Sequence, residues 1–61
     1  MEANDFCAWL EHMGYSDSEA ERKLGVTRKT IRGWREKGAP HYIALAASAL
    51  AYGLPPWKTV S

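Results

Sequence analysis

The chain is poor in cysteine: Cys7 is the only one in 61 residues. A single cysteine excludes an intrachain disulfide, and this usage favours a reducing, cytoplasmic setting. We expect Cys7 to be a small buried hydrophobe of the first helix. With 46% hydrophobic residues, the chain can form one small packed domain, which we expect to span 1–61.

Long apolar runs and early positive charge are also missing. No run approaches the ~18 apolar residues of a membrane-spanning helix. The first twenty-one residues contain six acids and no Lys or Arg, which argues against a secretory leader. We therefore expect a cytoplasmic protein without a membrane partner.

The sequence offers few groups for catalysis or metal binding. Its two histidines, His12 and His41, have no Ser or Cys nucleophile at a suggestive spacing, and no Gly-rich phosphate loop occurs. Together with Cys7 they share no spacing typical of metal ligands, and a structural zinc site needs four ligands. We expect no enzymatic activity, no cofactor, no metal and no small-molecule ligand.

The sequence does contain a strong separation of charge. Seven of its eight Lys and Arg residues lie between Arg22 and Lys37, where Glu36 is the only acid, so this segment carries a net charge of +6. The first twenty-one residues carry −6. The overall charge of +1 hides this asymmetry, and a polyanion would meet the local basic potential instead.

Capping and termination signals predict two helices in the first half of the chain. Asn4 is a favourable N-cap for the first helix, and Gly14 should end it. Ser16 and Glu19 have the spacing of a capping box, so a second helix should run over about 17–24. The apolar residues of the first helix follow a helical period: Phe6, Trp9, Leu10 and Met13.

Similar signals predict two helices in the second half. Thr27 should cap a third helix, which Gly38 ends. Pro40 suits the first turn of a fourth helix over about 41–52, which Gly53 and the prolines after it stop. No strand-like alternation occurs, so the expected fold is all-α: a compact four-helix domain.

The fourth helix is apolar on two sides. One stripe consists of Ile43, Ala46, Ala47, Leu50 and then Leu54. Of these, Ile43, Ala47 and Leu50 should pack on the first and third helices. The other stripe has no obvious place in so small a core: Tyr42, Leu45, Ala49 and Tyr52. Unless the alanines serve only as helix formers, this second stripe predicts a homodimer through the helix over about 40–53.

Several residues match a known motif in type and spacing. These are the helix positions Ala20 and Leu24, the turn Gly25-Val26-Thr27, and the positions Ile31 and Trp34 in the helix that follows. The segment over about 16–37 thereby resembles the helix-turn-helix of the Cro and phage-repressor superfamily.

Two residues in this segment are unusual. Glu21 stands where that superfamily usually has a small Ala, so its carboxylate must lean into solvent or pair with Arg28, Arg32 or Arg35. Gly33 inside the third helix costs about 1 kcal/mol relative to Ala. This cost is easier to understand if a side chain there would collide with DNA or with the facing helix.

The resemblance implies binding of double-stranded DNA, with the second helix of the motif in the major groove. The residues placed to read base edges are Arg28, Lys29 and Arg32. The residues placed to contact phosphates are Ser16, Ser18, Arg22, Thr27, Thr30, Arg35 and Lys37.

A chain this small leaves no room for an effector pocket, so binding itself would be the regulatory act. The resemblance implies a homodimeric repressor that occludes a promoter at an inverted-repeat operator, in a bacterial or phage-infected cell. Autorepressors of anti-CRISPR operons, Cro-like switch proteins and antitoxins would all read this way. The alternative is a protein-interaction module of the same fold, antitoxin-like, that docks an acidic partner.

Overall fold

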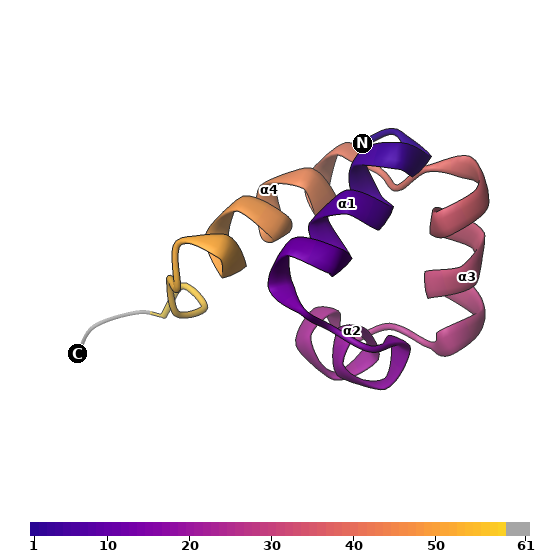
Figure 1. Cartoon of the computed structure of the whole chain (residues 1–61). Coiled ribbons are helices and arrows are strands. Elements are labelled where there is room, and N and C mark those ends of the chain that lie inside the picture. Colours follow the sequence, from indigo (N-terminus) through magenta and orange to yellow (C-terminus); the bar gives the residue numbers. More distant parts are fainter. Residues whose placement is uncertain (59–61) are drawn as a thin grey trace.

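The computed structural model describes residues 1–58 and contains four α-helices, with no strand in that range. The helices are α1 (Ala3–Met13), α2 (Asp17–Leu24), α3 (Arg28–Lys37) and α4 (His41–Ala51). α1 packs against both α3 and α4. α2 packs against α3 and lies near the C-terminal end of α1 (Figure 1). The predicted all-α, four-helix fold class is confirmed.

The predicted caps of α2 and α3 are present. The Ser16 hydroxyl accepts from the backbone N–H of Glu19, and the Glu19 carboxylate accepts from the backbone N–H of Ser16, both at 3.3 Å. At the start of α3, the Thr27 hydroxyl accepts from the backbone N–H of Thr30 at 3.3 Å. Gly25 ends α2 at a φ of 69°, the left-handed conformation that the short turn requires.

The start of α1 differs from the prediction. Asn4 does not cap the helix, because α1 already begins at Ala3 with Glu2 as its N-cap. The backbones of Met1 and Ala39 pair reciprocally, at 2.8 and 2.9 Å, and this contact fixes the chain just before the helix. Gly38 permits this approach, since a Cβ there would lie 2.8 Å from the Met1 carbonyl oxygen. A tertiary contact has therefore overridden the local capping signal.

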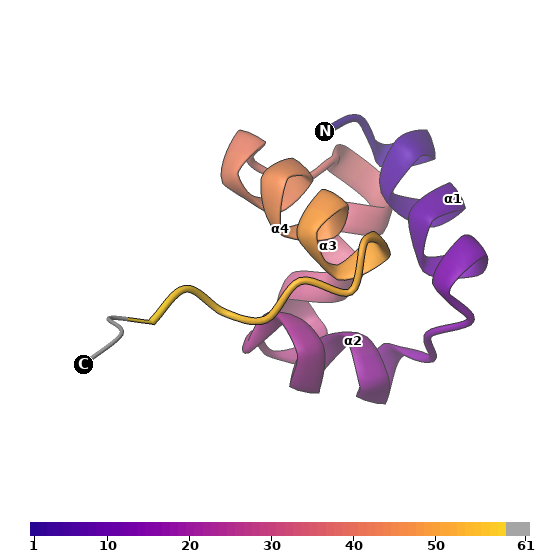
Figure 2. The same cartoon turned by 90° about the vertical axis from the view of Figure 1, so that its left-hand side faces the viewer.

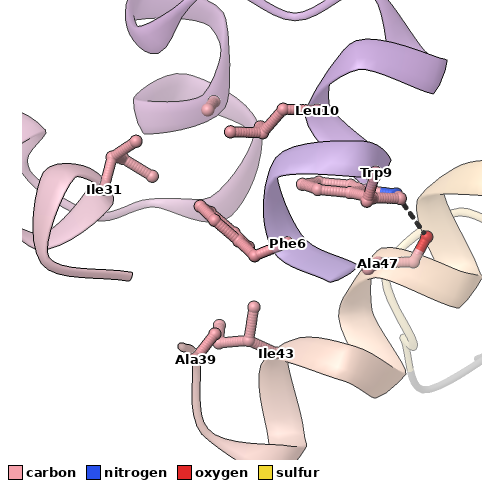
Figure 3. Packing of buried hydrophobic residues seen from close by; sticks show 8 residues of the cluster. Phe6, Trp9, Leu10, Ile31, Ala39, Ile43 and Ala47 are labelled. Carbon is pink, nitrogen blue, oxygen red and sulfur yellow. Dashed lines mark hydrogen bonds between the residues drawn. The ribbon is translucent and has the colours of Figure 1, made fainter. Parts of the chain in front are cut away.

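One cluster of buried residues joins all four helices (Figure 3). Phe6 lies at its centre, fully buried, with its ring 5.6 Å from that of Trp34 in an edge-to-face contact. The Trp9 indole donates to the Ala47 carbonyl at 3.1 Å and so ties α1 to α4. The buried members are Phe6, Trp9, Leu10, Ala20, Ile31, Ala39, Ile43 and Ala47. Cys7 is only half-buried, contrary to expectation, and its thiol donates to the Arg35 carbonyl at 3.6 Å.

The two apolar sides of α4 behave differently. Ile43 and Ala47 are buried and Leu50 is half-buried, as predicted for the inward stripe. Leu54 does not continue that stripe, because α4 ends at Ala51 and the chain turns away at Gly53 (Figure 2). Pro40 is the N-cap of α4, one position before the first turn where it was predicted.

Candidate nucleic-acid interface

α2 and α3 are consecutive helices joined by the short turn Gly25–Thr27. Ala20 of α2 and Ile31 of α3 are buried where the helices meet, and Leu24, Val26 and Trp34 pack partly buried against the same cluster. These apolar residues of the family resemblance therefore all belong to the core cluster or pack against it.

The outward face of α3 carries two cations without a partner. Successive residues of an α-helix are about 100° apart, so Lys29 and Arg32 lie roughly opposite the inward residues Ile31 and Trp34. Both cations are exposed, and neither forms an ion pair among the described residues. Glu36 is exposed on the same face.

Gly33 also lies on this outward side of α3. A Cβ added there would have no heavy atom within 4 Å. The facing helix therefore does not explain this glycine.

The N-terminus of α3 is unusually positive. Its first turn contains no acid and begins with Arg28 and Lys29, whereas the first turn of α2 contains Asp17 and Glu19. The helix macrodipole favours the acids at the start of α2 and opposes the cations at the start of α3. These cations gain nothing from the macrodipole of α3, and together with the free backbone N–H groups they favour an anion there.

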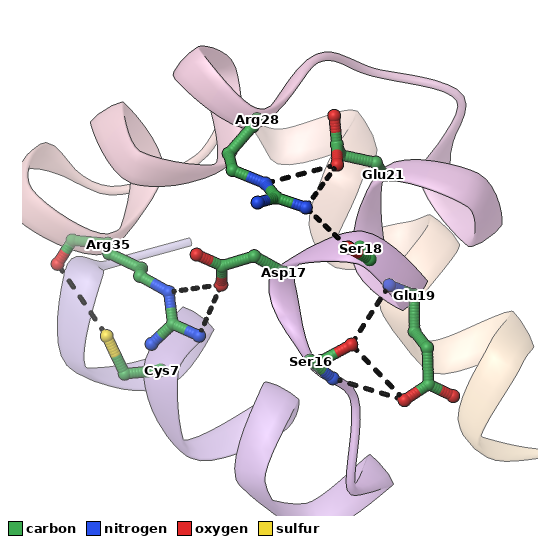
Figure 4. A network of polar contacts seen from close by, with 8 residues as sticks. All are labelled: Cys7, Ser16, Asp17, Ser18, Glu19, Glu21, Arg28 and Arg35. Carbon is green, nitrogen blue, oxygen red and sulfur yellow. Dashed lines mark hydrogen bonds and ion pairs between the residues drawn. The ribbon is translucent and has the colours of Figure 1, made fainter.

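Arg28 is already engaged by α2. Its Nε and Nη2 donate to the Glu21 Oε2 at 3.3 and 3.1 Å, and Nη2 also donates to the Ser18 hydroxyl (Figure 4). Pairing with Arg28 was one of the outcomes expected for Glu21, and the pair leaves the close contact at Ala20 intact. Two residues predicted to touch DNA, Arg28 and Ser18, thus bind each other in the free protein.

Arg35 is held in the same way near the other end of α3. Its Nε and Nη2 donate to the Asp17 Oδ1 at 3.1 and 2.8 Å, while its carbonyl accepts from Cys7 (Figure 4). Arg35 therefore joins α1, α2 and α3. The sequence held a signal for both pairs, since Asp17 and Glu21 are one turn apart on α2, and Arg28 and Arg35 are two turns apart on α3.

The other residues predicted to contact phosphates divide into two groups. The hydroxyls of Ser16, Thr27 and Thr30 take part in the helix caps, and those of Thr27 and Thr30 lie 3.0 Å apart. Arg22 and Lys37 are exposed and form no ion pair within residues 1–58. Five basic residues of the segment 22–37 thus remain unpaired there: Arg22, Lys23, Lys29, Arg32 and Lys37.

A second surface is apolar and lies on α4 and the segment after it. Every large hydrophobic residue that is exposed in the described range belongs to it: Tyr42, Leu45, Tyr52, Leu54 and Trp57. Ala49 lies half-buried between them. An open groove of about 300 Å³ adjoins this α4 surface, with Leu24, Ile43 and Leu50 in its wall. Patches of this kind on small proteins usually mark a site of association.

The described residues form neither a metal site nor a membrane-spanning helix. His12 and His41 are exposed, and residues 1–58 bring no three His, Cys, Asp or Glu side chains together as metal ligands. None of the helices described there is long and apolar enough to cross a membrane. Comparison of the chain with protein-family models, curated proteins and solved structures found no match.

Proposed function

We propose that the protein binds double-stranded DNA in a sequence-specific manner, with α2 and α3 acting as a helix-turn-helix. In this arrangement α3 enters the major groove and turns Lys29 and Arg32 toward the base edges. Arg22 and Lys37, at the margins, bind phosphates and position the protein on the duplex.

The outward face of α3 carries this proposal. Lys29 and Arg32 are exposed there and form no ion pair within residues 1–58. Gly33 lies beside them, although no heavy atom of the described protein would prevent a side chain at that position. The face belongs to a helix whose positive N-terminus is unfavourable for the helix alone and favourable next to phosphates. Solubility alone does not require cations at the N-terminus of α3, where the macrodipole opposes them.

The α4 surface supports a homodimer as the DNA-binding form. Tyr42, Leu45 and Tyr52 are 64%, 60% and 83% exposed, and they follow one side of α4 as far as its C-cap, Tyr52. Such a stripe meets a second copy of itself across a two-fold axis. A second copy also enlarges the apolar core of a chain near the lower size limit for independent folding.

A two-fold dimer of this size suits a repressor that occludes a promoter. Each copy presents one α3, so the operator is an inverted repeat with half-site centres about 10 bp apart, or a multiple of this. Together with the resemblance to phage repressors, this points to an autoregulator of a phage or another mobile element, acting in the bacterial cytoplasm.

An electrophoretic mobility shift with the DNA upstream of the protein's own gene tests this function. We expect a shift that weakens steeply with salt, and a footprint over an inverted repeat. Arg32→Ala should weaken the shift, whereas the matched control Lys58→Ala should not, because it removes the same charge from the segment after α4. Weak binding without sequence preference would instead favour an acidic protein partner.

A further inference from the structure

The bonds around Arg28 restrict what this side chain offers to a ligand. A guanidinium has five N–H donors. Here Nε–H and both hydrogens of Nη2 point at protein acceptors, since Glu21 Oε2 accepts from both nitrogens and the Ser18 hydroxyl accepts from Nη2. Within residues 1–58, only the two hydrogens of Nη1 are left without a protein acceptor.

Bidentate reading of guanine needs N–H groups from two adjacent nitrogens of the guanidinium, aimed at O6 and N7. Both edges of the Arg28 guanidinium that could supply such a pair include Nη2, which is occupied. We propose that Arg28 is a positioning residue, which fixes the start of α3 on α2 through Glu21 and Ser18, and that base reading is left to Lys29 and Arg32. This inference rests on the proposed function.

The rest of the α2–α3 contact shows why such fastening matters. Ala20 is the only fully buried residue of α2, and Leu24 is half-buried against the core, so few apolar side chains of α2 help to seat it. Arg28 is the first residue of α3 and Arg35 the eighth, and each uses the same two nitrogens on one carboxylate oxygen of α2. The two ion pairs thus hold α3 near both of its ends.

The electrostatics of α3 point the same way. A cation in a first turn opposes the macrodipole unless an acid neutralises it. Glu21 neutralises Arg28 in this way, whereas no acid of the described chain pairs with Lys29. An ion pair whose partners are 47% and 30% exposed contributes little to stability. Its larger effect is geometric, because two donors on one carboxylate fix the direction of the side chain.

The test compares four variants by the ratio of operator affinity to random-duplex affinity, which cancels the general effect of charge. They are Arg28→Ala, Glu21→Gln, the exchange Glu21→Arg/Arg28→Glu, and the control Glu11→Gln. Thermal melts followed by circular dichroism check that each variant is folded at the temperature of the assay. The operator is the sequence that wild type selects from a random pool.

Positioning by Arg28 makes three linked outcomes expected. Arg28→Ala and Glu21→Gln lower the ratio by the same factor of about three to ten, the scale of coupling between contacting residues, although their charge changes are opposite. The exchange restores the ratio, because it rebuilds the pair with its charges reversed. Glu11→Gln tightens binding to both duplexes and leaves the ratio unchanged, since Glu11 lies exposed on α1 and forms no ion pair within the described range.

Direct base reading by Arg28 would give a different pattern. Arg28→Ala would then lower the ratio through one base pair, Glu21→Gln would not lower it, and the exchange variant would be the poorest binder. This result overturns the inference and leaves the proposed function standing. If wild type selects no sequence from the pool, the proposed function falls and the inference falls with it.

Discussion

At the scale of single residues, the basic side chains of the segment 22–37 differ in whether they already have a partner. Arg28 and Arg35 are bound to acids of α2, whereas Lys29, Arg32 and Lys37 form no ion pair among residues 1–58. A cation that pairs with protein gives up part of its attraction to DNA. The unpaired cations should therefore dominate both the affinity and its dependence on salt.

The positions of the unpaired cations predict two classes of mutant. Lys29→Ala or Arg32→Ala should cost about 1–3 kcal/mol on the operator and relax the preference at one base pair. Arg22→Ala or Lys37→Ala should weaken operator and random DNA alike, and should flatten the salt slope by about one ion per site. Titrations by fluorescence anisotropy at several salt concentrations separate the classes. If Arg32→Ala bound all sequences as wild type does, α3 would be rotated from this placement.

Gly33 gives a prediction in which stability and binding move in opposite directions. Gly33→Ala fills space that no protein atom occupies, so it should stabilise α3 by about 1 kcal/mol and raise the Tm by about 4–8 °C. If DNA lies against this face, the added methyl should also weaken operator binding by about 1–3 kcal/mol. A thermal melt and a mobility shift on the same sample test both parts. An unchanged affinity would mean that DNA does not approach Gly33.

At the scale of helices, the ends that depend on local chemistry could be predicted from the sequence. The caps at Ser16 and Thr27 and the left-handed turn at Gly25 are all determined within four residues. The start of α1 could not be predicted in this way, because it depends on Met1 meeting Ala39, thirty-eight residues away. Local signals contain no information about such a contact.

The candidate site was predictable to a similar degree. Periodicity placed Lys29 and Arg32 on the outer side of α3 without reference to any other helix. The engagement of Arg28 and Arg35 depends on how α2 crosses α3, and the sequence shows only that opposite charges recur on one side of each helix. Which basic residues remain without an ion pair therefore depends on the tertiary packing of α2 on α3.

Phe6 is the residue on which the helix packing depends most. It is fully buried and lies between the aromatic rings of Trp9 and Trp34, at 6.0 and 5.6 Å. Phe6→Ala should cost about 3–5 kcal/mol, which matches the whole stability expected for a domain of this size, so the variant should be largely unfolded at 25 °C. Circular dichroism measures this directly, with Met13→Ala as the half-buried control that should remain folded. A fully helical Phe6→Ala variant would show that the core lies elsewhere.

At the scale of the whole molecule, charge and apolar surface are separated between helices. The basic residues of the segment 22–37 that form no ion pair within residues 1–58 lie on α2 and α3, whereas the exposed large hydrophobics of that range lie on α4 and the segment that follows it. Association through α4 therefore covers apolar surface without covering the outward face of α3. In the proposed two-fold dimer each copy keeps α3 accessible, so that the two basic faces can attract one duplex together.

This separation predicts that dimerisation can be removed without unfolding the chain. Leu45 is 60% exposed, so Leu45→Glu leaves the core intact while placing a charge at the centre of the α4 surface. We expect a folded monomer whose operator affinity falls much more than its affinity for random DNA, because one copy reaches only one half-site. Ala8→Glu is the matched control, since it adds the same charge at an exposed position of α1 and should remain dimeric. Sedimentation at tens of micromolar decides the matter: wild type at monomer mass would remove the dimer, and Leu45→Glu at dimer mass would move its interface away from α4.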